Sequence, residues 1–228
     1  MTEDLAARLS SIAALAEPAR RDLYLYVAGQ PAPVSRDQAA ADTGMPRHAV
    51  KFHLDRLVDE GLLEVEYRRL SGRQGPGAGR PAKLYRRAAR EVAITLPERR
   101  YDLAGRILAA AVHAADDGIG IRTAVARAAS EEGRAVGTHA LAAGGPTISV
   151  VSVLAAYGYQ PRTVGDQTVL ANCPFRTLAV DHTELICGMN LEFVRAMTQQ
   201  LGLADVDVQL EPSPGQCCVT LRPLADSP

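Results

Sequence analysis

Residues 45–70, MPRHAVKFHLDRLVDEG followed by LLEVEYRRL, decide the fold of the first part of the chain. The first segment has apolar residues at helical spacing, and Pro46 stands near its first helical position. The second segment is a run of β-forming residues after Gly61. The apolar stripe consists of Val50, Leu54, Leu57 and Val58, and the residues on or near the opposite face are Arg47, His48, Lys51 and Phe52.

The residues on either side of this stretch complete a winged helix. Upstream, residues 5–16, 18–29 and 34–44 read as three helices. Ser35 is the expected N-cap of the third helix and Gly44 its terminator. Downstream, SGRQGPGAGRPA is a flexible tip and KLYRR a returning strand. Arg73 and Arg80 belong to that tip.

The charge of the chain is uneven. Residues 1–90 carry 15 Lys and Arg against 11 Asp and Glu, whereas residues 91–228 carry 10 against 15. Within residues 67–90 there are eight basic residues and no acidic one. Such a run is often only a solvated loop, but next to a helix-turn-helix it predicts contact with phosphates.

The first part of the chain resembles the ArsR-type winged-helix bacterial repressors. The segments that carry the resemblance are, in this order, LAEPARRDLYLYV, HAVKFHLDRLVDEGLL and GRPAKLYRR. The resemblance covers roughly the first ninety residues. It implies that the fourth helix enters the major groove of an operator, so that Arg47, His48 and Lys51 contact bases and phosphates and Phe52 lies beside them. It also implies that Arg73 and Arg80 reach phosphates or the minor groove. His53 either touches DNA or packs against a helix.

The remainder of the chain reads as an α+β domain. Residues 100–115 and 122–143 are two long alanine-rich helices, and residues 147–159 form a third. Residues 162–172 are a hairpin centred on Gly165-Asp166, and residues 205–223 are two strands around a Pro-Gly turn. We therefore expect a DNA-binding domain at residues 1–90 and a sensor and dimerisation domain at 91–228. The small residues Ala109, Ala110, Ala111 and Ala115 would let long helices approach closely, in a homodimer or around a cavity.

Two of the four cysteines lie in ANCPFRTLAVDHTELICGMN, residues 171–190. One straight helix would separate Cys173 from Cys187 by about 21 Å, at about 1.5 Å per residue. Asp181 and Glu184, however, have the spacing of a capping box and predict that a new helix begins at residue 182. If the chain reverses there, the two thiols come within contact range.

The other two cysteines, Cys217 and Cys218, are adjacent on a predicted strand, where neighbouring side chains point to opposite faces. A turn at the start of that strand could let both act as ligands. We therefore take Cys173, Cys187, Cys217 and Cys218 as candidate metal ligands, with His182 as a reserve for the fourth position.

A second resemblance, over about residues 145–222, concerns these cysteines. The order NCP, a second cysteine shortly after and a third in a terminal strand, behind a winged helix, looks like the SufR-type iron–sulfur sensing repressors. This implies a [4Fe–4S] cluster that sets DNA affinity. The adjacent Cys217-Cys218 and the segment CGMN depart from that pattern.

Other interpretations of the sequence remain open. Thiolates also suit zinc, a Cys173–Cys187 disulfide would be a redox switch, and cysteines can be plain core residues. Residues 147–159 could instead line a pocket for an apolar effector. No nucleophile–base constellation or phosphate loop is recognisable, so we do not expect an enzyme. Without a membrane-spanning run or a secretory signal in the sequence, a cytoplasmic location is expected.

Overall fold

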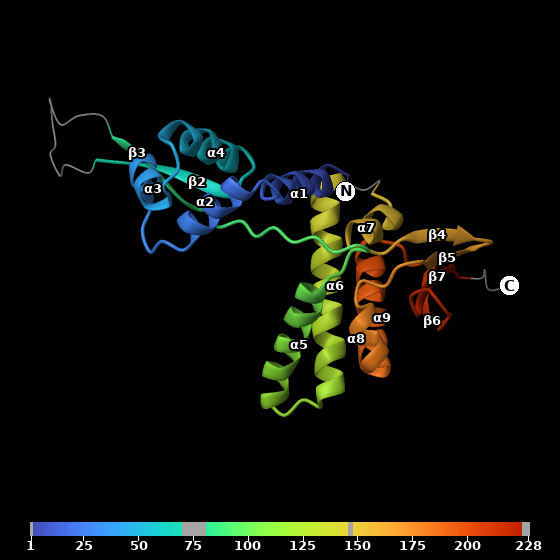
Figure 1. Cartoon of the computed structure of the whole chain (residues 1–228). Coiled ribbons are helices and arrows are strands. Elements are labelled where there is room, and N and C mark those ends of the chain that lie inside the picture. The colour runs from blue at the N-terminus through green and yellow to red at the C-terminus, as the bar shows by residue number, and fades with distance from the viewer. Residues whose placement is uncertain (1, 70–80, 146–147, 225–228) are drawn as a thin grey trace. The chain divides into compact units, whose positions relative to one another are not determined.

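The computed structural model describes residues 2–69, 81–145 and 148–224. The chain forms two compact units, Met1–Ile94 and Thr95–Pro228. Both units combine helices with antiparallel strands, so the predicted α+β class is confirmed (Figure 1). Among the described residues, no helix is both long enough and apolar enough to cross a membrane.

The four helices of the first unit follow the predicted order. They are α1 (Thr2–Ala14), α2 (Pro18–Ala28), α3 (Arg36–Thr43) and α4 (Arg47–Asp59). The Glu17 carboxylate accepts the N–H groups of Ala19 and Arg20 and so caps α2. Ser35 accepts the N–H of Gln38 at 3.1 Å, and Gly44 ends α3 with φ of 70°. The two predicted ends of α3 are therefore confirmed.

A three-stranded sheet in the order β1-β3-β2 completes the first unit. Strand β2 (Leu63–Arg68) pairs antiparallel with β3 (Ala82–Arg87), as predicted for the wing. The two-residue strand β1 (Val34–Ser35), which the sequence did not predict, pairs with the other side of β3. Val50, Leu54 and Leu57 of α4 are fully buried in the core of this unit. Arg73 and Arg80 lie outside the described residues.

Three of the helices of the second unit form its centre. They are α5 (Tyr101–Asp116), α6 (Ile121–Gly144) and α9 (Thr183–Gln200). Helices α6 and α9 run parallel, because Arg122 pairs with Glu184 near their starts and Gly137 meets Gln200 near their ends. A Cβ on Gly133 would overlap the carbonyl oxygen of Phe193, so this glycine lets the two backbones approach closely. The two long helices are confirmed, whereas the third, α7 (Val150–Ala156), is shorter than predicted.

A four-stranded sheet in the order β4-β5-β7-β6 packs with these helices. Its strands are β4 (Pro161–Val164), β5 (Gln167–Leu170), β6 (Val206–Leu210) and β7 (Val219–Pro223). The predicted hairpin at Gly165 is confirmed, with φ of 63° at that glycine. Cys217 and Cys218, however, precede β7 and do not lie on it. The turn at Pro214-Gly215 continues through them, which removes the strand alternation that we had expected to separate their side chains.

The predicted break between two helices is present, but its cause is not the predicted one. His182 separates α8 (Arg176–Asp181) from α9, and its φ and ψ are −135° and 53°. No side chain caps the start of α9, so the prediction of a capping box formed by Asp181 and Glu184 was wrong. Backbone bonds hold the turn, from His182 N to Leu178 O and from Ile186 N to His182 O.

The close packing of α6 on α9 yields a stability prediction. Gly133→Ala should lower the free energy of unfolding of the second unit by about 1–3 kcal/mol, the usual cost of overpacking. Gly188→Ala is the control, because nothing lies within 4 Å of a Cβ at this position of α9. It should be neutral or stabilise by up to about 1 kcal/mol. Urea unfolding followed by circular dichroism measures both, and equal stabilities of the two variants would contradict the close approach.

Candidate DNA-binding surface and thiol site

One face of α4 is open to solvent while the other is buried. Arg47, His48, Lys51 and Phe52 are all exposed, and Phe52 retains 63% of its surface. The Phe52 ring packs edge-on against His53, with ring centroids 5.4 Å apart. The four residues that the sequence assigned to DNA therefore share an accessible helix surface behind the turn at Gly44–Pro46. His53 itself is mostly covered, and its Nδ1 lies 3.7 Å from Glu17, which agrees with a packing role.

Acidic side chains already orient the basic residues of this surface. Arg47 forms an ion pair with Asp37 of α3, and its hydrogen bond lowers the pKa of that carboxyl group. Lys51 lies 3.8 Å from Asp55, which also accepts a 2.8 Å bond from Lys83 of β3. Exposed ion pairs of this kind contribute only about 0–1 kcal/mol each, so phosphate oxygens can replace the carboxylates at small cost.

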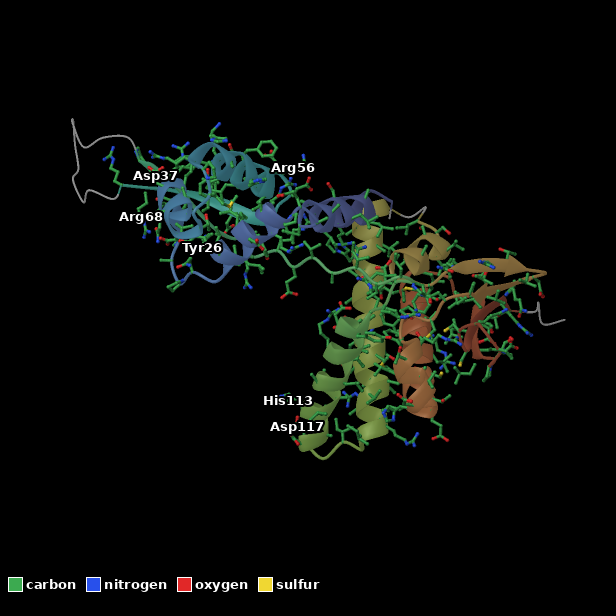
Figure 2. All side chains as sticks on the ribbon, in the orientation of Figure 1. Tyr26, Asp37, Arg56, Arg68, His113 and Asp117 are labelled. Atoms are coloured by element: carbon green, nitrogen blue, oxygen red, sulfur yellow. The ribbon has the colours of Figure 1, made fainter. Side chains whose placement is uncertain are left out.

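The strands of the wing carry further arginines. Arg68 lies 3.5 Å from Glu66, and Arg86 lies 2.8 Å from Glu64. Both guanidinium groups remain more than half exposed. Figure 2 labels Arg68 near the end of β2 and Asp37 on α3. Basic side chains from α4 and from both strands are thus available on the first unit.

The four cysteines of the second unit meet at one place. The Sγ atoms of Cys187 and Cys218 are 3.1 Å apart, and the thiols of Cys173 and Cys217 are hydrogen-bonded to each other. Cys173 and Cys218 line one pocket, and the charge of Cys173 also acts on Cys187, so the two pairs share one site. His182 separates α8 from α9 in this region, and the predicted antiparallel packing of the two helices stays a prediction. We call these four residues the thiol site.

Two sulfurs of the thiol site accept the same kind of backbone bond. Cys173 Sγ accepts the N–H of Phe175, and Cys217 Sγ accepts the N–H of Val219, in each case from two residues further along the chain. Cys217 Sγ also lies 3.2 Å from the Nδ2 donor of Asn190. N–H donors favour a sulfur that carries negative charge, which is the form that binds metals.

The charges around the thiol site differ from one sulfur to the next. The bond from Cys217 lowers the pKa of Cys173 to about 7, and the Phe175 N–H and the charges of Arg99 and Arg176 act in the same direction against its burial. Burial and the bond to Cys218 raise the pKa of Cys187 to about 12. Donation to Cys173, together with burial, raises the pKa of Cys217. Of Cys173, Cys187 and Cys217, only Cys173 therefore has surroundings that favour the thiolate.

The geometry also limits which groups the thiol site can hold. Within the described residues, no three His, Cys, Asp or Glu side chains are disposed around one point as a single metal ion requires. His182 is exposed at the helix junction. All four cysteines are free thiols and form no disulfide. The sequence suggested a Cys173–Cys187 disulfide, but the sulfur of Cys187 contacts that of Cys218. A pocket of about 220 Å³ opens beside Cys173 and Cys218, with Arg176 and Val180 on its wall.

Sequence reasoning missed the polar residues that surround the sulfurs. Asn190 and Asn172 are buried, and Arg99 bonds both to Asn172 Oδ1 at 2.6 Å and to the Cys173 carbonyl at 3.0 Å. An asparagine at CGMN and one in NCP, each next to a cysteine segment, were the available signals. The apolar side of α7, considered as a pocket wall, is used instead for the core, where Val153 and Leu154 are buried.

Comparisons with known proteins concern the first unit. The family model described as a helix-turn-helix domain matches residues 15–66, from the end of α1 into β2. Comparisons with curated proteins and with solved structures gave no significant match. The first unit thus contains a helix-turn-helix domain, which supports a role for the protein as a DNA-binding transcriptional regulator.

Proposed function

We propose that this regulator is a cytoplasmic, homodimeric repressor whose affinity for its operator is set by an iron–sulfur cluster held by Cys173, Cys187, Cys217 and Cys218. The observation that carries the proposal is the convergence of all four cysteines behind a helix-turn-helix domain. Four soft thiol ligands suit such a cluster, which binds one thiolate per iron and does not need the sulfurs around a single point. When bound, the cluster would supply a redox-active and oxidant-sensitive centre.

The residues around Cys173 provide a path from the thiol site to the first unit. The carbonyl groups of Cys173 and Pro174 accept bonds from Arg99 and from the Arg100 N–H, at 3.0 and 3.1 Å. Tyr101 donates to Thr177 at 2.8 Å. Residues 99–101 lie near the start of the second unit, which begins at Thr95, directly after Ile94. A displacement of Cys173 would therefore move the segment that leads to the DNA-binding unit.

The homodimer is proposed because one winged helix reads only half of an operator. On α5, Gly105, Ala109 and Val112 lie on one helix face and are all exposed, and Val112 retains 58% of its surface. Ala111, by contrast, is fully buried in the core. Small residues on the outer face would let α5 approach the same helix of a second copy.

A thiol–disulfide switch is the second candidate function. The 3.1 Å separation of the Cys187 and Cys218 sulfurs is the observation that favours it. A peroxide could oxidise this pair: the two thiols would lose two protons and two electrons to the peroxide, which is reduced to water or alcohol, and the new S–S bond would tie α9 to the loop before β7 without any metal. Zinc is a less suitable occupant, because a structural zinc site needs its ligands around one ion. The absorbance of anaerobically purified protein in the visible range distinguishes a cluster from both alternatives.

The exposed face of α4 predicts the effect of two substitutions on DNA binding. Lys51→Ala should weaken binding and lower the slope of log affinity against log salt by about 1, the value for one lost phosphate contact. Arg47→Ala should also change the preferred operator sequence. Fluorescence anisotropy over a range of salt concentrations measures both effects. Arg134→Ala, at an exposed position of α6, is the control, and an equal loss in all three variants would contradict a role for α4.

The proposed ligands predict the behaviour of serine variants. Cys173→Ser and Cys187→Ser should each abolish the chromophore and the bound iron, while Cys218→Ser, at the half-buried position, should only destabilise them. Loaded and apo protein should differ in operator affinity by about 5- to 150-fold, the range of a typical allosteric coupling. Iron and sulfide analysis with binding assays at one salt concentration provides the test. Retention of iron in both of the first two variants would show that the ligand set is wrong, and equal affinities would make the cluster purely structural.

The outer face of α5 predicts a substitution that should disrupt the proposed homodimer. Val112→Glu should convert the dimer to a monomer, because it places a charge in an apolar contact between small residues. Light scattering at micromolar concentration measures the change, and Val164→Glu, at another exposed valine of the second unit, is the control. A wild-type protein that is monomeric in this measurement contradicts the proposed dimer.

A further inference from the structure

Asn190 connects the thiol site to a buried tyrosine. Its side chain extends from α9 and is only 1% exposed. Its Nδ2 lies 3.2 Å from Cys217 Sγ, and its Oδ1 accepts a short hydrogen bond from the hydroxyl of Tyr159, in the segment between α7 and β4. Tyr159 is itself buried. Three separate parts of the chain are joined by this one polar chain, Tyr159–Asn190–Cys217.

The bond from Tyr159 determines which end of the Asn190 amide faces the sulfur. Burying an amide without partners is costly, so both of its polar ends need hydrogen bonds. Because the hydroxyl donates to Oδ1, the amino group is left to donate to Cys217 Sγ. With the N–H of Val219, this sulfur receives two N–H donors. An apolar side chain of similar size at position 190 would keep the volume filled but remove both hydrogen bonds of the amide.

We propose that Asn190, oriented by Tyr159, is a positioning residue that holds the Cys217 sulfur as a hydrogen-bond acceptor and thereby raises the reduction potential of the proposed iron–sulfur site. The inference rests on the proposed function. N–H donors withdraw electron density from a metal-bound thiolate and stabilise the reduced, more negative state. The two sulfurs beside the open pocket, those of Cys173 and Cys218, have no such side-chain amide among the described contacts.

The test uses full-length protein reconstituted anaerobically with ferrous iron and sulfide. Asn190→Leu should keep the iron content of the wild type after reconstitution and shift the midpoint potential to a more negative value. In competition with a chelator it should bind iron about 10- to 100-fold more weakly, the usual effect of losing an outer-shell partner. Tyr159→Phe should shift the potential in the same direction by less, because it only frees the amide to rotate. This second variant keeps the proposal testable if Asn190→Leu does not fold.

Thr198→Val is the matched control. Thr198 is also a buried polar residue of α9, but its hydroxyl bonds to the Val194 carbonyl, away from the sulfurs. Its loss should alter stability and leave the midpoint potential and the resonance Raman iron–thiolate stretch unchanged. An iron-loaded Asn190→Leu with the wild-type potential, or an equal shift in Thr198→Val, would overturn the role of Asn190 and leave the proposed cluster intact. A wild-type protein that takes up no iron or sulfide would overturn both proposals.

Discussion

The break between α8 and α9 at His182 is the constraint on which the second unit depends. A continuous helix through this region would place Cys173 and Cys187 about 21 Å apart. In the folded chain both contact the adjacent pair Cys217-Cys218. The turn between α8 and α9 uses backbone bonds alone, apart from the Thr183 hydroxyl, which donates to the Ala179 carbonyl. Holding four sulfurs together would therefore reinforce a turn that has no side-chain cap of its own.

The interior around the thiol site is built to keep these elements in place. Gly133 and Gly137 bring α6 against α9, and α9 in turn presents Cys187 and Asn190 toward the loop before β7. The sulfurs then face unlike surroundings. Cys173 lies beside Arg99, Arg176 and an open pocket, whereas Cys217 is enclosed by Asn190 and Tyr159. The pocket opens the thiol site to solvent beside Cys173 and Cys218. Away from the pocket, the hydrogen bonds of Asn190 to Cys217 and Tyr159 hold the Cys217 sulfur in place.

Most of the fold, and less of the site, could be predicted from the sequence. Local signals such as Ser35, Gly44 and Gly165 act within a few residues, so helix ends and the hairpin followed from them. Strand β1 is only two residues long and forms because it pairs with β3. No pattern within its own residues could therefore predict it. Cys217 and Cys218 were placed on a strand because β-formers follow them, although the turn before them continues further. The asparagine in CGMN was visible in the sequence, but its role was not, since only the fold brings Tyr159 to its other side.

The link between the two units follows from where the second unit begins. Residues 98–101 bond to residues 172–177 through the Arg99 guanidinium, the Arg100 N–H, the Tyr101 hydroxyl and the Asn172 amide, which donates to the Glu98 carbonyl at 3.0 Å. Each such bond contributes about 0.5–1.5 kcal/mol net. An allosteric coupling of about 1–3 kcal/mol therefore needs only two or three of them to differ between two states. The backbone of Cys173 is part of this contact, so under the proposed function a change at its sulfur would act on residues 98–101, a few residues after the first unit ends at Ile94.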